Sequence, residues 1–111
     1  MTIKVGDKLP SVELRTTGEK GPQKLSTEEL FSGRRVALFA VPGAFTPGCS
    51  QTHMPGFVVN ADSIFEKGID QIACLATNDA FVMSAWQRDQ NAEHILMLSD
   101  GNGDFIRQLG L

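Results

Sequence analysis

The stretch RVALFAVPGAFTPGC, residues 35–49, joins an apolar run to a cysteine through two prolines and two glycines. The run at residues 35–41 is too short for a typical helix and is apolar at almost every position, so it predicts a central strand buried on both faces. Thr46 is a favourable helix N-cap and Pro47 a favourable first helical residue. The stretch therefore predicts a strand, a turn and a helix whose first turn holds Cys49.

Outside this stretch, strand and helix patterns alternate along the chain. Further strands are predicted at residues 11–16, 23–25, 69–77 and 95–98, and helices at residues 26–30, 57–67, 79–90 and 104–109. This alternation predicts an α/β fold in which helices cover both faces of one sheet. In such sheets reactive groups lie beyond the carboxyl ends of the strands, which is where the quoted stretch places Cys49.

Two of the predicted helices begin at recognisable capping residues. Ser26, followed three residues later by Glu29, has the pattern of a capping box. Asn78-Asp79 can cap the helix at residues 79–90. We expect the apolar stripe of that helix to consist of Phe81, Val82, Ala85 and Trp86.

The composition limits the class of protein. The 111 residues carry a formal net charge of −3 and are 41% apolar, which suits a single globular domain. No basic patch is visible, so nucleic-acid binding is not expected. The longest apolar run, residues 36–41, is far too short to cross a bilayer, and the first residues lack the apolar core of a signal peptide. Two cysteines do not make a disulfide scaffold, so we expect a reducing, cytoplasmic location.

The surroundings of Cys49 favour a reactive thiol. Amide groups in the first turn of a helix point toward its N-terminus and carry partial positive charge, so they stabilise a thiolate. The Thr46 hydroxyl can donate a hydrogen bond to the sulfur or accept one, and Pro42 stiffens the exit of the strand and keeps water away from the thiol. The alternative is an inert buried cysteine that serves as a small apolar side chain. The strand-end position and the helix start favour the reactive interpretation.

Pro42, Thr46 and Cys49 spell P-x-x-x-T-x-x-C, which resembles the active-site motif of the peroxiredoxins. The longer string VPGAFTPGCSQTHMPGF, residues 41–57, and the string TNDAFVMSAW, residues 77–86, resemble the type II, or atypical two-cysteine, branch of that family. The resemblance covers essentially the whole chain. It implies a thioredoxin-like fold, with a central mixed sheet and helices on both faces, in one domain over residues 1–111.

The resemblance also implies a reaction. Cys49 would attack a peroxide, either hydrogen peroxide or an alkyl hydroperoxide, and become a sulfenic acid. Thr46 would hydrogen-bond the peroxide and the thiolate, backbone amides near Gly48 would contact the same oxygens, and Pro42 would shield the sulfenic acid. Glutaredoxin with glutathione, or thioredoxin, would re-reduce the cysteine. Neither a cofactor nor a metal is implied. A homodimer contact would lie near Phe45, Phe81 and Trp86.

The sequence departs from the family pattern near its end. The family uses a late arginine to activate both thiolate and peroxide, and none of the arginines present, Arg15, Arg34, Arg35, Arg88 and Arg107, stands in the matching context. The family's last strands and C-terminal helix are also missing, so we expect a C-terminally incomplete domain that oligomerises or is marginally stable. The alternative function is a truncated, non-catalytic thioredoxin-like module with a redox-sensitive thiol.

A second cysteine, Cys74, lies in the predicted strand at residues 69–77, 25 residues after Cys49. Some type II members, notably those of plants, have a cysteine at this place that resolves the sulfenic acid, and the resemblance extends that role to Cys74. The alternative is a packing role, since a cysteine inside an apolar strand is usually buried.

Two further patterns point to other chemistry. His53 follows Cys49 by one helical turn and suggests a metal site or a cysteine hydrolase, but His94 is the only other histidine and no orienting acid is visible. A packing or hydrogen-bonding role for His53 is therefore favoured. Residues 100–104 imitate the start of a calcium loop, but Phe105 replaces its glycine, so we predict a simple turn there.

Overall fold

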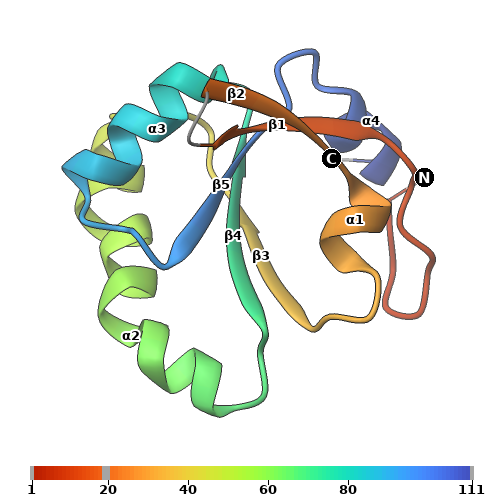
Figure 1. The fold of residues 1–111 in the computed structure, drawn as a ribbon, viewed down its shortest axis with the longest axis horizontal. Coiled ribbons are helices and arrows are strands. Elements are labelled where there is room, and N and C mark those ends of the chain that lie inside the picture. Colours follow the sequence, from red (N-terminus) through yellow and green to blue (C-terminus); the bar gives the residue numbers. More distant parts are fainter. Residues whose placement is uncertain (1, 19–20, 111) are drawn as a thin grey trace.

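A mixed five-stranded sheet runs through the middle of the molecule (Figure 1). The computed structural model describes residues 2–18 and 21–110. The strands are β1 (Glu13–Gly18), β2 (Gly21–Ser26), β3 (Val36–Ala40), β4 (Gln71–Ala76) and β5 (Ile95–Ser99). Their order across the sheet is β2-β1-β5-β4-β3. The last three strands of the chain are parallel to one another, and β1 pairs antiparallel with both β2 and β5.

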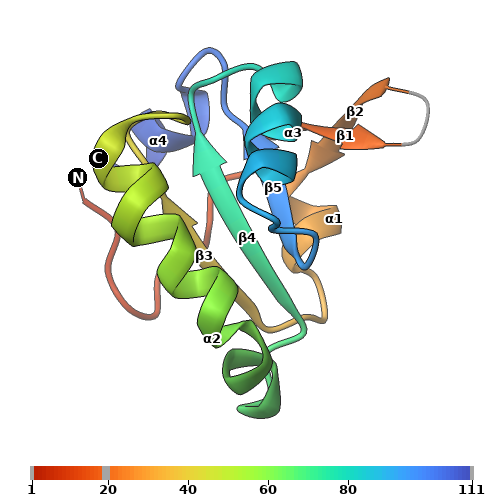
Figure 2. The ribbon, with the colours of Figure 1, turned by 90° about the vertical axis from the view of Figure 1, so that its left-hand side faces the viewer.

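Helices cover both faces of this sheet, as the sequence predicted. They are α1 (Thr27–Phe31), α2 (Met54–Glu66), α3 (Ala80–Asp89) and α4 (Asp104–Leu109), and a π-helical turn, η1 (Cys49–His53), leads into α2. The helices α2 and α3 lie on one face of the sheet, and α1 and α4 lie on the other (Figures 1 and 2). The architecture is therefore the α/β arrangement expected from the alternation of strands and helices, and it agrees with the thioredoxin-like fold that the family resemblance implied.

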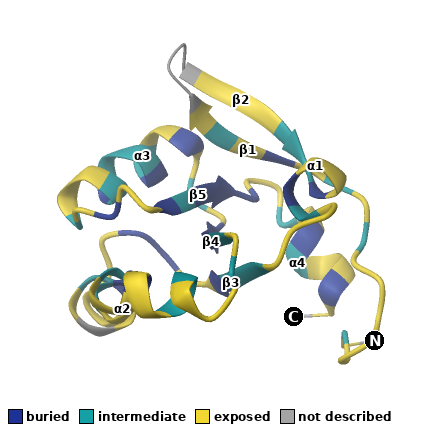
Figure 3. Ribbon diagram, turned by 60° about the horizontal axis from the view of Figure 1, so that its bottom comes forward, coloured by how far each residue is buried: buried dark blue, intermediate teal, exposed yellow. Residues whose placement is uncertain are grey.

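The strand β4 separates two apolar cores. Ile72 and Cys74 pack into the core beneath α2 and α3, together with Trp86 of α3. Ala73 and Leu75 belong to the opposite core, which also takes side chains from α1 and α4. Because neighbouring residues of a strand point to opposite faces, a continuous apolar run is what two covered faces require. The dark middle layer of Figure 3 shows this burial of β4 and β5.

Local side chains define the helix boundaries. The Ser26 hydroxyl oxygen accepts a hydrogen bond from the Glu29 amide at 3.2 Å, which confirms the predicted cap of α1. The buried carboxylate of Asp100 accepts hydrogen bonds from the amides of Phe105 and Ile106, at 3.2 and 2.9 Å. Asp100 thus holds the turn before α4, and the turn prediction for this stretch is confirmed.

The prediction that residues 35–41 form a strand is confirmed over Val36–Ala40, but the central position predicted for it is wrong. Among the described residues, β3 pairs with β4 alone and stands at the edge of the sheet. Val36, Ala37 and Leu38 are half-buried and Ala40 is exposed. The run is apolar because β3 contributes side chains to both cores, not because it has a strand on either side. The position of a strand within a sheet depends on pairing between residues that are far apart in the sequence. A local residue pattern does not reveal that pairing.

The apolar stripe predicted for α3 is also partly wrong. Phe81 is 67% exposed, whereas the buried residues of this helix are Ala80, Met83 and Trp86. The helix is rotated so that its buried face begins one residue earlier than predicted. An exposed phenylalanine therefore stands in the first turn of α3, beside the carboxyl ends of the strands.

Candidate active site

The loop that follows β3 carries the predicted site. The amide of Val41 donates to the Leu75 carbonyl at 2.9 Å, so the loop leaves the sheet beside the end of β4. Phe45 has a φ of 63°, in the left-handed region that non-glycine residues rarely adopt, and its side chain is 52% exposed. Helical structure begins at Pro47, directly after Thr46, as predicted.

Cys49 lies in the first turn of this helix, and only 5% of its surface is exposed. The Thr46 carbonyl accepts a hydrogen bond from the Ser50 amide at 2.8 Å, which closes the turn around the cysteine. The π-helical geometry of η1 then widens the helix between Cys49 and His53 before the regular turns of α2 begin. No residue pattern predicted this wide turn, and such turns are frequent at functional sites.

The Thr46 hydroxyl is engaged within the loop. It donates a hydrogen bond to the Gly43 carbonyl at 2.7 Å. With its only proton committed, its oxygen retains lone pairs that can accept a hydrogen bond from another group. Gly43 packs closely on the same side chain, because a Cβ built on Gly43 would lie 3.2 Å from the Thr46 methyl carbon. Of the two hydrogen-bonding modes considered for Thr46, acceptance is the one this arrangement leaves open.

Asn78, which the sequence analysis treated only as part of a helix cap, bonds to the same loop. Its side-chain oxygen accepts a hydrogen bond from the Ala44 amide at 2.7 Å. Its backbone carbonyl accepts one from the Ser99 hydroxyl at 2.6 Å. The helix cap itself is Asp79, whose carboxylate accepts from the Val82 amide at 2.8 Å. The sequence feature that could have indicated this contact is the position of Asn78 just after β4, the strand that pairs with β3.

Trp86 lies beneath the site and not on the surface. It is fully buried, and its indole nitrogen donates to the Ser50 hydroxyl at 3.0 Å. The Trp86 side chain is therefore not exposed to a partner, and the dimer contact expected near it stays a prediction. Phe45 and Phe81, the other two residues of that expectation, are exposed.

Cys74 is completely buried in β4, between Phe39 of β3 and Met97 of β5. Burial, with a smaller electrostatic contribution from the nearby Cys49, raises the pKa of Cys74 to about 12. Both cysteines are free thiols. At neutral pH the Cys74 thiol is protonated and packed in the same core as Cys49. A resolving role for Cys74 stays a prediction.

The His53 ring packs against aromatic neighbours. Its centroid lies 5.1 Å from that of Phe39 and 5.7 Å from that of Phe57, and these two phenylalanines stack on each other at 3.8 Å. These contacts agree with the packing role favoured for His53. In the part of the chain that the structure describes, no group of three or more residues is suited to hold a metal ion.

Two arginines of the described segments make side-chain contacts within their own helices. Arg107 pairs with Asp104 within α4, and Arg88 donates to the Ser84 hydroxyl at 3.0 Å within α3. Arg34 and Arg35 precede β3, at the opposite end of that strand from the cysteine loop. Across residues 2–18 and 21–110, no hydrogen bond joins an arginine side chain to Cys49 or Thr46.

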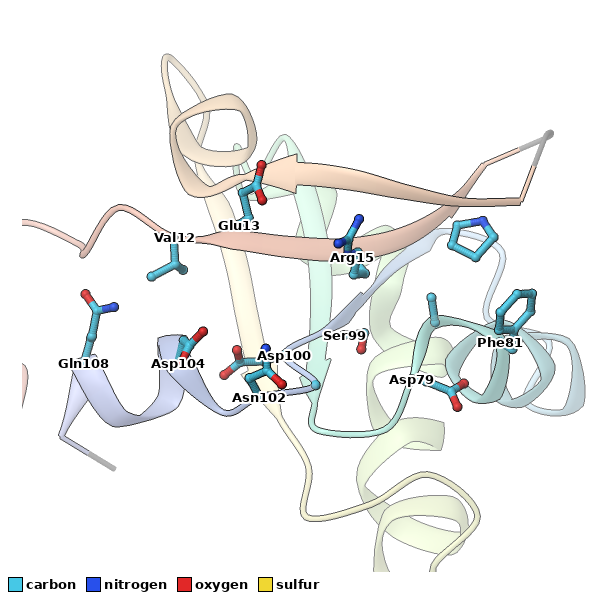
Figure 4. A pocket seen from close by; sticks show the side chains of 13 residues that line it. Val12, Glu13, Arg15, Asp79, Phe81, Ser99, Asp100, Asn102, Asp104 and Gln108 are labelled. Carbon is cyan, nitrogen blue, oxygen red and sulfur yellow. The ribbon is translucent and has the colours of Figure 1, made fainter.

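A pocket of about 670 Å³ opens between the β1–β2 hairpin, the start of α3 and α4 (Figure 4). Its lining includes Arg15 and several carboxylates, but neither Cys49 nor Thr46. The carboxylates of Asp79 and Asp100 cap helices, and that of Asp104 pairs with Arg107. These groups already have structural partners, so the pocket does not compete with the cysteine loop as the reactive site.

Two properties define the class of protein. The fold is thioredoxin-like, and a buried cysteine occupies the first turn of a helix beyond the carboxyl end of a parallel strand. The family model described as Redoxin matches residues 4–111. Peroxiredoxin-2D of Arabidopsis thaliana is 42% identical over 111 residues, which cover 98% of this chain and 68% of the relative. The chain therefore belongs to the peroxiredoxins of the redoxin family, in the type II branch.

Other relatives agree with this assignment. The chloroplastic Peroxiredoxin-2E of Arabidopsis thaliana is 49% identical over 115 residues, covering 99% of this chain and 48% of the relative. The structure of reduced Prx3 from Vibrio vulnificus in complex with hydrogen peroxide has a TM-score of 0.96 and 50% identity, covering 99% of this chain and 70% of that one. The chain spans about half the length of the first curated relatives it matches, 48% and 51%. Within the described residues, no helix is both long and apolar enough to span a membrane.

Proposed function

We propose that this protein is a thiol peroxidase in which Cys49 reduces hydrogen peroxide and alkyl hydroperoxides. The observation that carries the proposal is the folded motif: Pro42, Thr46 and Cys49 share one turn-and-helix segment, and the cysteine is buried in the first helical turn. The similar Prx3 of Vibrio vulnificus has been solved in complex with hydrogen peroxide, which supports the substrate class.

The chemistry follows from the position of the sulfur. The Cys49 thiolate attacks one peroxide oxygen, the O–O bond breaks, and Cys49 becomes a sulfenic acid. The second oxygen takes a proton and leaves as water or an alcohol. The Thr46 oxygen, whose own proton is donated to Gly43, accepts a hydrogen bond from the peroxide and so orients it. Amides near Gly48 stabilise the negative charge that develops on the oxygens, and Pro42 limits access to the sulfenic acid.

A thiol reductant must then return two electrons to Cys49. We propose glutaredoxin with glutathione, or thioredoxin, because the family resemblance implies these reductants and either can reduce a cysteine through a mixed disulfide. Cys74 is the internal alternative, and its complete burial makes it the slower one. The cytoplasmic location stays a prediction.

We also propose a homodimer that uses the face carrying Phe45 and Phe81. The two phenylalanine side chains are 52% and 67% exposed, and exposed aromatic side chains beside a site are typical of interfaces. Phe81→Ser should lower the association constant measured by light scattering over a range of protein concentrations, while Val59→Ser, at another exposed apolar position, should not. A wild-type protein that stays monomeric at every concentration would contradict the dimer.

The peroxidase proposal is tested by peroxide consumption. The chain, supplied with a dithiol reductant, should consume hydrogen peroxide much faster than free cysteine does, and Cys49→Ser should abolish the difference. A wild-type rate equal to that of free cysteine would overturn the proposal, and would favour a non-catalytic module with a redox-sensitive thiol.

A further inference from the structure

In the loop after β3, both polar groups of one peptide, its carbonyl and its N–H, form hydrogen bonds with side chains. The Gly43–Ala44 peptide has its carbonyl bonded to the Thr46 hydroxyl, at 2.7 Å, and its N–H bonded to the Asn78 side chain, at 2.7 Å. Because a peptide group is planar, its N–H and carbonyl turn together. The orientation that Asn78 imposes on the Ala44 N–H is therefore also the orientation of the carbonyl that takes the proton of Thr46.

This peptide needs a partner that fixes its orientation. Gly43 has no side chain and so permits rotations that other residues resist. Two residues further on, Phe45 has a φ of 63°, which costs on the order of 1 kcal/mol or more for a non-glycine residue. If the peptide turned over, the Ala44 N–H would face Thr46 and occupy its oxygen, and the hydroxyl proton would be free to point elsewhere.

Asn78 is itself well anchored. It follows β4, and its carbonyl accepts a hydrogen bond from Ser99, which ends β5 and is only 3% exposed. The next residue, Asp79, caps α3. The amide side chain of Asn78 thus extends from the rigid carboxyl edge of the parallel strands to the loop that leaves β3.

We propose that Asn78 is a positioning residue for the peroxidase reaction. It holds the Gly43–Ala44 peptide so that the Thr46 hydroxyl points its proton at Gly43 and presents only lone pairs to the substrate. A peroxide O–H can then donate to Thr46, which places the O–O bond for attack by Cys49. This inference rests on the proposed function, but the orientation of the peptide is testable without it.

The test compares two reactions of Cys49 in a set of variants. Reaction with hydrogen peroxide needs the oriented Thr46 oxygen, whereas alkylation by iodoacetamide needs only the thiolate. The ratio of the two second-order rates therefore cancels any general change in thiolate reactivity or exposure. Asn78→Ala removes the acceptor, Asn78→Asp keeps an acceptor oxygen of the same reach, and Asn60→Ala removes another side-chain hydrogen bond, from α2 to the Gly56 carbonyl.

We expect Asn78→Ala to lower this ratio by about tenfold or more, as a misplaced reacting group does. Asn78→Asp and Asn60→Ala should keep the wild-type ratio. In a Thr46→Val background, Asn78→Ala should have little further effect, because Asn78 acts through Thr46. An unchanged ratio in Asn78→Ala, or a full additional loss in the Thr46→Val background, overturns the inference.

Hydrogen exchange of the Ala44 amide gives an answer that does not depend on activity. This amide should be protected in the wild type and in Asn78→Asp, and should exchange faster in Asn78→Ala. An unprotected Ala44 amide in the wild type overturns the inference whatever the peroxide rate is. A wild type that reacts with peroxide no faster than free cysteine, with Ala44 protected, overturns the proposed function and the catalytic part of the inference together.

Discussion

At the scale of the residue, the direction of one hydrogen bond decides what Thr46 can do. The sequence predicted that its hydroxyl serves the thiol and the substrate, but left open whether it donates or accepts. The structure shows the proton donated to the Gly43 carbonyl, 2.7 Å away, so the oxygen is available as an acceptor. A hydroxyl group that already has a fixed donor direction loses little freedom when a peroxide binds, which favours rapid reaction.

Thr46→Val keeps the branched shape and removes the hydroxyl. We expect the second-order rate with hydrogen peroxide to fall by at least about tenfold, or about 1.4 kcal/mol of barrier. The free energy of unfolding should fall by about 1 kcal/mol, because the Gly43 carbonyl loses a partner. Thr46→Ser, which keeps the hydroxyl, is the control. Stopped-flow rates that are equal in Thr46→Val and wild type would show that Thr46 does not contact the peroxide.

At the scale of the element, capping side chains set where helices begin. Asp79 was predictable because an acidic residue before an apolar-periodic segment is a local signal. The contact of Asn78 was not predictable in the same way, since its partner Ala44 lies 34 residues away. The π-helical turn after Cys49 also escaped prediction, because no residue pattern in Cys49–His53 distinguishes it from an ordinary helical turn.

The cap of α3 makes a measurable contribution to stability. Asp79→Ala removes the acceptor of the Val82 amide and should lower the free energy of unfolding by about 1 kcal/mol. Asp79→Asn should lower it much less, because asparagine caps helices about as well as aspartate. Urea denaturation of the three proteins gives the comparison. Equal losses in the two variants would mean that the charge of Asp79, not its capping bond, stabilises the helix.

At the scale of the whole molecule, the layers of the fold were predictable and the order of the strands was not. Gly33, Pro42 and Gly68 mark the ends of apolar segments, so the succession of strands and helices can be seen in the sequence. The placement of β3 at the edge of the sheet depends on which strands meet across long chain separations. The burial of Cys74 followed from its apolar strand, while its two neighbours, Phe39 and Met97, required the register.

The buried Cys74 links global stability to alkaline pH. The pKa of this thiol rises from 9.0 to about 12 on folding, mainly because burial disfavours the charged form. Above about pH 9 the unfolded chain releases the proton while the folded chain keeps it, so stability falls as pH rises toward about 12. The slope contributed by this group is about 1.4 kcal/mol per pH unit in that window, and below about pH 9 the group contributes no slope.

Cys74→Ala removes this titration. The difference in unfolding free energy between wild type and Cys74→Ala should be constant below about pH 9 and should shrink above it. The titrations of groups that do not interact with Cys74 cancel in this difference. Urea denaturation at a series of pH values provides the measurement, and a difference that stays constant into the alkaline range would show that Cys74 ionises as freely in the folded protein as in the unfolded chain.

The most direct test of the peroxidatic role of Cys49 is to identify the sulfur atom that peroxide oxidises. The reduced protein is treated with a limiting amount of hydrogen peroxide, a sulfenic-acid trap is added, and mass spectrometry of the peptides locates the adduct. We predict that the adduct forms on Cys49 within the first turnover and that Cys74 remains an unmodified thiol. An adduct on Cys74 with Cys49 unmodified, or oxidation of both cysteines at the rate of free cysteine, would contradict the assignment of Cys49 as the reacting thiol.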